Sequence, residues 1–157
     1  MEKSDGFFSE KQNDIGCRKG YETMRQKLLH DNWQMTRRGA NDWIPAVVPG
    51  SVYGDLLANG RMEDPYYRDN ELKALEIIGD DFEYVTHFDV PEDFLKEEKL
   101  ILRFDGIDTI ADIMLNGTFL GHTENMHRIF EYSVRELLKP EDNELRVLLF
   151  TPTRYLE

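Results

Sequence analysis

The sequence predicts an all-β domain, an antiparallel β-sandwich with short helical turns between its strands. Apolar and polar residues alternate in several short segments, which is typical of strands with one buried face. The connections between these segments are short, as expected for neighbouring antiparallel strands. In addition, Asn116-Gly117 separates two apolar runs. This is the strongest local signal for a β-hairpin, because both central turn residues need positive φ.

The first expected elements are less regular than those that follow. A strand is predicted around Trp33, and residues 43–50 should be extended because each proline biases its predecessor away from the helical region. From Phe82 onward the period becomes two, and the alternation persists to the last predicted strand. The predicted strands comprise residues 29–35, 82–90, 100–104, 110–115, 118–122 and 145–150.

Helical turns are expected at three places. Ser51 is a good N-cap for an amphipathic helix that ends at Asn59-Gly60. Residues 64–71 form an unusually aromatic turn, and residues 72–75 should add one helical turn. The segment Ser133-Val-Arg-Glu136 has the spacing of a capping box ahead of a third helical turn.

The N-terminal residues differ from the rest of the chain. Residues 1–23 contain few aliphatic side chains and no clear period, so we expect a loose N-terminal arm. The denser sequence begins at Met24, a second candidate for the natural start. The predicted organisation is therefore an arm over residues 1–23 and a β-sandwich domain over residues 24–157.

Composition excludes several functional classes. The formal net charge of the 157 residues is −12, which would repel nucleic acids and anionic membranes. The longest apolar run is far too short for a membrane helix, and the first residues show no signal peptide. The single cysteine, Cys17, excludes an internal disulfide and paired-cysteine zinc sites. We therefore expect a cytoplasmic protein that uses no metal or other cofactor and binds neither nucleic acid nor membrane.

The sequence contains no self-contained catalytic signature. Its four histidines are outside zinc-protease and nucleophile-elbow patterns; they are His30, His87, His122 and His127. The segment 105–108 lacks the remaining ligands of a calcium loop, so a solvated turn is the expected structure. Hydrolysis of a glycoside needs two carboxyl groups at a defined separation. Such a pair cannot be selected from 31 acidic residues without a fold.

Three stretches together resemble a known family. They are Val48–Gly60 (VPGSVYGDLLANG), Asp64–Glu71 (DPYYRDNE), and Phe104–Gly121 (FDGIDTIADIMLNGTFLG) continuing into Glu124–Arg128 (ENMHR). Their order and content look like the N-terminal sugar-binding domain of glycoside hydrolase family 2. Within that family the chain is most similar to β-mannosidases, and the hairpin is shared with the related β-galactosidases. The resemblance covers about residues 27–157.

The resemblance implies a jelly-roll β-sandwich like galactose-binding domains. It further implies that a later (β/α)₈ barrel of the same polypeptide supplies both catalytic glutamates of a retaining mechanism. This chain would then be a non-catalytic piece of an enzyme acting on β-mannosides or β-galactosides, with its own domain truncated after Thr151–Tyr155. Two alternatives remain open: a free-standing carbohydrate-binding module, and a structural sandwich that braces a barrel without touching sugar.

Four residues are the best candidates for contact with sugar. Asp69 and Asn70 follow the aromatic turn, whereas Asn125 and Arg128 follow the second strand of the hairpin. Loops on a rigid sandwich concentrate binding groups. Asparagine donates and accepts hydrogen bonds, and arginine presents several donors. The alternative is structural: Asn125 caps a turn, Met126 fills the core and Arg128 pairs with a surface carboxylate.

Overall fold

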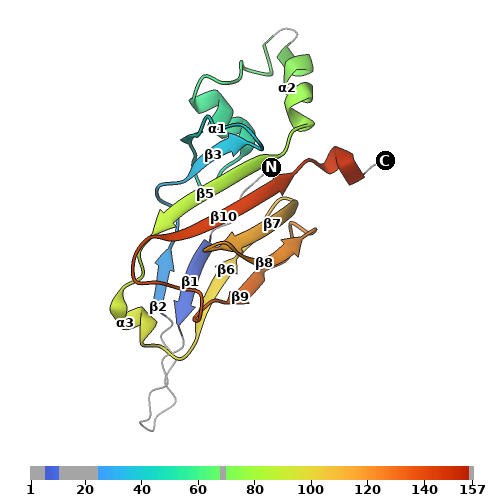
Figure 1. The fold of residues 1–157 in the computed structure, drawn as a ribbon. Helices are drawn as coiled ribbons and strands as arrows, with labels where there is room; N and C mark the ends of the chain where they lie inside the picture. The colour runs from blue at the N-terminus through green and yellow to red at the C-terminus, as the bar shows by residue number, and fades with distance from the viewer. Residues whose placement is uncertain (1–5, 11–24, 68–69, 156–157) are drawn as a thin grey trace.

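Two antiparallel sheets pack face to face in the computed structural model, which describes residues 6–10, 25–67 and 70–155 (Figure 1). The larger sheet has six strands in the order β4-β3-β5-β10-β7-β8, and the smaller has four in the order β2-β1-β6-β9. This arrangement confirms the predicted jelly-roll β-sandwich.

The strand bounds follow the sheets. In the larger sheet they are β3 Gln34–Arg37, β4 Ile44–Pro45, β5 Phe82–Phe88, β7 Ile110–Leu115, β8 Thr118–Thr123 and β10 Asn143–Phe150. In the smaller sheet they are β1 Gly6–Glu10, β2 Arg25–Leu28, β6 Leu100–Phe104 and β9 Phe130–Ser133. The helical elements are α1 Val52–Ala58, α2 Asn70–Ile78, α3 Glu92–Leu95 and the 3₁₀ turn η1 Pro152–Tyr155.

The alternation seen in the sequence places one face of each long strand in the core. Leu100 and Leu102 of β6 are fully buried, as are Ile113 of β7 and Leu145 of β10. Each such side chain contributes about 1.5–3 kcal/mol when it leaves water. The core therefore lies between the two sheets, and this burial fixes the strand register.

The hairpin and the first helix form as predicted. Asn116 and Gly117 join β7 to β8 with φ values of 50° and 77°. Ser51 caps α1, because its Oγ accepts a hydrogen bond from the Gly54 amide at 3.1 Å. Gly60 follows the helix with φ of 65°. Local residue chemistry is sufficient to specify both elements.

The predicted strand over residues 29–35 is wrong in its first part. Strand β2 ends at Leu28 and β3 begins at Gln34, and the two belong to different sheets. Asn32 takes a positive φ of 59° between them, and the Trp33 indole donates to the Leu29 carbonyl at 2.7 Å. The left-handed residue turns the chain from one sheet to the other, which an apolar pattern does not reveal.

The other two helical predictions need adjustment. Helix α2 runs for nine residues, more than the single turn expected. Around the predicted capping box, Ser133 is the last residue of β9. The Leu137 and Leu138 amides then donate to the Val134 carbonyl at 2.9 and 3.2 Å. This segment is a hydrogen-bonded turn that follows a strand, and β9 itself was absent from the expected strands.

The N-terminal segment also differs from the expectation. Five residues of the predicted loose arm, Gly6–Glu10, form β1, which pairs with β2 on one side and β6 on the other. Backbone hydrogen bonds to two neighbours order such a strand without the apolar period on which the expectation depended. The rest of residues 1–23 lies outside the described residues.

Candidate functional site

The turn with the predicted contact residues Asn125 and Arg128 lies at one end of the sandwich, called here the upper end. Strands β6, β8 and β10 finish there, and β5, β7 and β9 begin there, beneath α1 and α2 (Figure 1). Two of its loops touch: a Cβ built on Gly106 would stand 2.9 Å from the Met126 carbonyl oxygen. Because no side chain fits there, Gly106 permits this close approach.

A buried carboxylate holds the upper end together. Asp81, at the start of β5, is 5% exposed and accepts a hydrogen bond from the Thr151 amide at 3.0 Å. Its second oxygen lies 3.3 Å from the Arg38 guanidinium. The Arg38 amide also donates to the Asp81 carbonyl at 2.8 Å. Asp81 thus ties the ends of β3 and β10 to β5, and it gives the surrounding loops a rigid base.

A pocket of about 220 Å³ opens at the upper end. Its walls are mostly apolar, and its polar side chains come from Tyr53, Asp80, Asp108 and Thr151. The Tyr53 hydroxyl is a hydrogen-bond donor at neutral pH, and burial raises its pKa further above its ordinary value. Ligand pockets commonly have about 300–1,000 Å³. This pocket therefore has room for part of a sugar rather than a whole oligosaccharide.

Two larger hollows lie elsewhere on the surface. One of about 330 Å³ adjoins β3 and both longer helices, with Arg37, Asp42 and Arg61 among its lining residues. The Arg61 guanidinium lies 3.6 Å from the Asp42 carboxylate. The other, of about 440 Å³, lies beside His87 and Asp142, whose ring nitrogen and carboxylate are 2.8 Å apart. Both are large enough for a monosaccharide, but neither contains a predicted contact residue.

Asn125 and Arg128 lie together in one exposed turn between β8 and β9. The Asn125 Oδ1 accepts a hydrogen bond from the His127 amide at 2.9 Å, and the Arg128 amide donates to the Asn125 carbonyl at 3.4 Å. The Arg128 guanidinium stands 6.0 Å from the Phe130 ring centre. Asn125 therefore stabilises the turn, while Met126 is 43% exposed and does not fill the core.

The other predicted pair lies in a different segment. Asn70 begins α2, and its side-chain amide donates to the Asp64 carbonyl at 3.0 Å. Asp69 lies outside the described residues. Figure 1 shows α2 standing above the sheets, apart from the β8–β9 turn. The structure thus brings Asn125 and Arg128 together and places Asn70 apart from them, at the first residue of α2 rather than in the loop that the sequence predicted.

The sequence interpretation missed a buried polar pair in the core. The Tyr84 hydroxyl donates to Asp55 Oδ2 at 3.0 Å, and Asp55 Oδ1 accepts from the Val47 amide at 2.9 Å. Burial raises the pKa of Tyr84, and the charge and hydrogen bond of Asp55 raise it further. One signal for this pair was available: Asp55 lies three residues after Val52, on the apolar face of α1.

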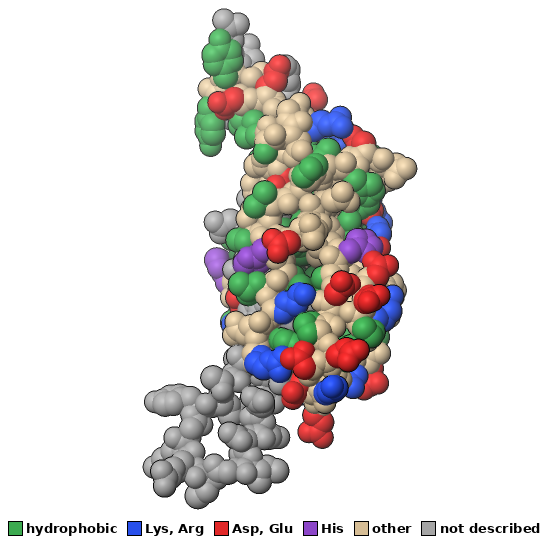
Figure 2. Space-filling model, turned by 90° about the vertical axis from the view of Figure 1, so that its left-hand side faces the viewer, with side chains coloured by type: hydrophobic (Ala, Val, Ile, Leu, Met, Phe, Trp, Pro, Cys, Tyr) green, Lys and Arg blue, Asp and Glu red, His purple; other side chains and the backbone are tan. Residues whose placement is uncertain are grey.

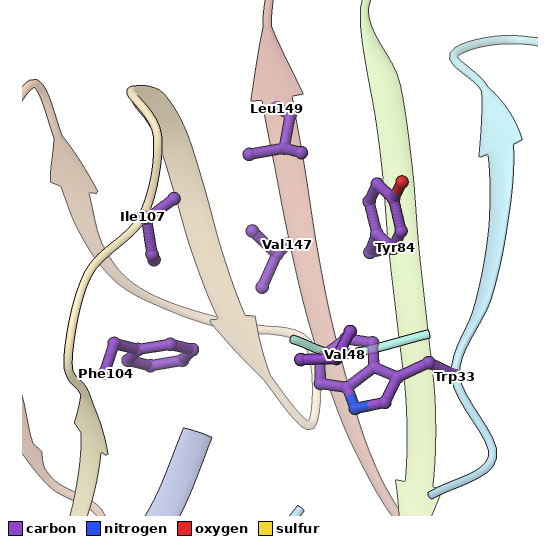
Figure 3. A pocket seen from close by; sticks show the side chains of 7 residues that line it. All are labelled: Trp33, Val48, Tyr84, Phe104, Ile107, Val147 and Leu149. Atoms are coloured by element: carbon purple, nitrogen blue, oxygen red, sulfur yellow. The ribbon is translucent and has the colours of Figure 1, made fainter. Parts of the chain in front are cut away.

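The space beside Tyr84 is a small gap between the two sheets (Figure 3). Its volume is about 20 Å³, close to that of one water probe. The gap is lined by Trp33, Val48, Tyr84, Phe104, Ile107, Val147 and Leu149. An apolar gap of this size stays dry. It is a packing feature of the core and has no room for a sugar.

The described residues contain no group of three or more His, Cys, Asp or Glu side chains arranged to hold a metal ion. Cys17 lies outside them. Within the same ranges, no helix has the length and apolar character that a membrane crossing requires.

Comparison with known proteins connects this sandwich to glycosidases. Residues 33–157 match the family described as glycosyl hydrolase 2 galactose-binding domain-like. The β-mannosidase of Rattus norvegicus is 33% identical over 129 residues, which are 82% of this chain and 14% of the rat protein. β-Mannosidase B of Aspergillus terreus is 39% identical over 111 residues, 66% of this chain and 13% of that protein.

Solved structures agree with these sequence relationships. The β-D-mannosidase of Dictyoglomus thermophilum superposes with a TM-score of 0.79 at 39% identity, covering 82% of this chain and 16% of its own. A β-D-glucuronidase of the same organism, at 17% identity and a TM-score of 0.59, shares the fold. The chain thus spans about one-seventh of the length of the curated relatives it matches.

Proposed function

Because this chain belongs to the glycosyl hydrolase 2 galactose-binding domain-like family, we propose that it is the N-terminal, non-catalytic sandwich of an enzyme that hydrolyses β-mannosides. The observation that most supports this proposal is the similarity of the chain to β-mannosidases, in both sequence and structure, over most of the length of the chain. In this proposal the two catalytic carboxylates of a retaining hydrolase belong to a barrel elsewhere in the same polypeptide. The sandwich contributes to the shape of the sugar-binding pocket and to contacts with the sugar.

The proposed contribution to catalysis is a wall of the sugar-binding pocket. The turn with Asn125 and Arg128 is exposed, and the Asn125–His127 hydrogen bond stabilises it. This local hydrogen bonding reduces the conformational entropy that the turn would lose on binding sugar. Arg128 supplies several donors for sugar hydroxyls, and Asp69 and Asn70 are proposed to act from the segment that leads into α2.

The experiment is to express the polypeptide encoded by the complete reading frame and assay it on aryl β-mannoside and aryl β-galactoside. We expect turnover of the mannoside to exceed that of the galactoside. A preference for the galactoside would redirect the proposal to the related β-galactosidases. A reading frame that ends with this sandwich would contradict it, and sugar titration would then test whether the chain is a free-standing carbohydrate-binding module.

A further inference from the structure

Large apolar side chains are exposed on the part of the molecule that projects above the sheets. Tyr66 is 97% exposed and Tyr67 is 60% exposed, both in the link before α2, and Leu75 of α2 is 53% exposed. Figure 2 shows hydrophobic side chains gathered on this projection, with acidic side chains beside them. We call Tyr66, Tyr67 and Leu75 the tyrosine surface. Exposed apolar groups gathered in this way mark interaction sites in soluble proteins.

The loop that presents the two tyrosines is held by its own hydrogen bonds. Asp64 Oδ1 accepts from the Tyr66 amide at 2.9 Å, and the Asp64 carbonyl accepts from the Tyr67 amide at 3.1 Å. The same carbonyl accepts from the Asn70 side chain at 3.0 Å. Because these hydrogen bonds hold the backbone of residues 64–67, a partner can bury the two rings at a smaller cost in backbone ordering. Tyrosine is also enriched at the centre of protein interfaces.

We propose that the tyrosine surface is the contact on which the catalytic part of the same polypeptide packs. This inference rests on the proposed function and adds the surface through which the two parts meet. The relatives have about six-sevenths of their length outside the matched region, so they provide a partner of sufficient size. The location of the C-terminal element supports an intramolecular contact: η1 lies at the upper end, as does α2 (Figure 1).

The surroundings of the tyrosine surface indicate the chemistry of its partner. Ile77 of α2 and Pro152 of η1 line the same pocket, so a chain that continues past η1 starts next to α2. A tethered partner has a high effective concentration at such a short distance. Glu63, Asp64 and Glu76 are exposed beside the apolar side chains. The complementary surface should therefore be apolar at its centre and carry lysine or arginine at its rim.

Hydroxyl-radical footprinting of the 157-residue chain and of the polypeptide from the complete reading frame tests this proposal. Oxidation of Tyr66 and Leu75 should fall about tenfold in the longer polypeptide, because buried side chains lose contact with solvent radicals. Leu28 of β2 is a matched internal control, since it is 55% exposed and Leu75 is 53% exposed. Its oxidation should be the same in both proteins.

A pair of charge substitutions gives the second measurement. Leu75→Lys should lower the melting temperature of the longer polypeptide, whereas Leu28→Lys should not, and both should leave the 157-residue chain nearly unchanged. Equal oxidation of Tyr66 in the 157-residue chain and in the longer polypeptide, with β-mannosidase activity intact, would overturn this inference. The proposed function would then remain supported. Concentration-dependent protection of Tyr66 in the short chain would identify a second copy as the occupant and would also overturn it. An inactive longer polypeptide would instead contradict the proposed function.

Discussion

Tyr84 and Asp55 form a contact that couples core packing to protonation. The folded state holds the Tyr84 proton more tightly than the unfolded chain does, because burial raises the pKa of this hydroxyl above its ordinary value of 10.0. The contribution of this raised pKa to the free energy of unfolding is fully present below pH 10 and decreases as the pH rises above that value. For one proton the free energy of unfolding falls by about 1.4 kcal/mol per pH unit.

Tyr84→Phe tests this coupling. At neutral pH we expect a loss of about 1–3 kcal/mol in the free energy of unfolding, because Asp55 Oδ2 loses the Tyr84 donor. Above pH 10 the variant should show a shallower loss of stability than the parent chain. Urea titrations from pH 7 to 11 provide the measurement. Tyr66→Phe, at an exposed tyrosine, is the control. It should change neither the free energy of unfolding at neutral pH nor its decrease above pH 10.

The backbone conformation at position 117 requires glycine, whereas the space around it does not. Its φ is 77°, yet a Cβ placed there would meet no heavy atom within 4 Å. Gly117→Val should therefore cost about 1–3 kcal/mol through backbone strain alone. Thermal unfolding measures the effect. Thr118→Val, one position later in extended β8, is the control and should be nearly neutral; equal melting temperatures for the two variants would contradict the assigned turn.

Asn125 and Arg128 need a test that separates binding from stability. In the longer polypeptide, Arg128→Ala should lower kcat/KM for aryl β-mannoside by about tenfold while the melting temperature is nearly unchanged. Lys99→Ala, on the exposed segment after α3, is the control. Asn125→Asp keeps the acceptor for the His127 amide but loses the side-chain amide donor. It should preserve the turn and still lower kcat/KM.

A structural role for this turn would give a different result. In that case Asn125→Asp would retain full activity, because the change preserves the side-chain acceptor of the His127 amide hydrogen bond that stabilises the turn. Activity that decreases only in proportion to the amount of folded protein would lead to the same conclusion. The site assignment would then be wrong, whereas the proposal for the whole enzyme would remain.

Strand β1 occupies a central position in the smaller sheet. Ser9 lies opposite Gln26 of β2 and Ile101 of β6. Proline in a central strand removes a ladder hydrogen bond and is excluded from such positions. We expect Ser9→Pro to lower the free energy of unfolding by about 2–3 kcal/mol. Ser9→Ala keeps the backbone amide and should be nearly neutral.

Hydrogen exchange provides an independent measurement of β1. The amides of residues 6–10 that bond to β2 or β6 should exchange on the timescale of global unfolding, as the amides of β6 do. Fast exchange there, together with no effect of Ser9→Pro, would support the loose arm that the sequence predicts. Protection would show that these residues contribute to the stability of the sandwich.

The isolated 157-residue chain should hydrolyse neither aryl β-mannoside nor aryl β-galactoside. Retaining hydrolysis needs a nucleophile and an acid/base, and in the proposed enzyme both belong to another domain. Release of the aryl group by the purified chain measures this. The longer polypeptide serves as the positive control. Turnover that follows the purified short chain through chromatography would contradict the assignment of catalysis to a separate domain.

Much of the fold follows from residues close together in sequence. The Asn116–Gly117 hairpin and the Ser51 cap were predictable because each depends on the backbone preferences of a few neighbours. The alternation of β6 and β10 predicted their buried faces for the same reason. Three motifs in one order were sufficient to identify the family, which the match over residues 33–157 confirms.

Tertiary structure decided the features that depend on partners distant in sequence. Gly6–Glu10 is a strand because β2 and β6 supply its hydrogen bonds, and the chain changes sheets at Asn32. Asp55 and Tyr84 are 29 residues apart and meet only when α1 packs on β5. The exposure of the tyrosine surface and the separation of Asn70 from Asn125 likewise depend on how α2 stands on the sandwich. Local sequence determines conformation, but burial and pairing require the assembled sheets, because their energies come from contacts that no short segment contains.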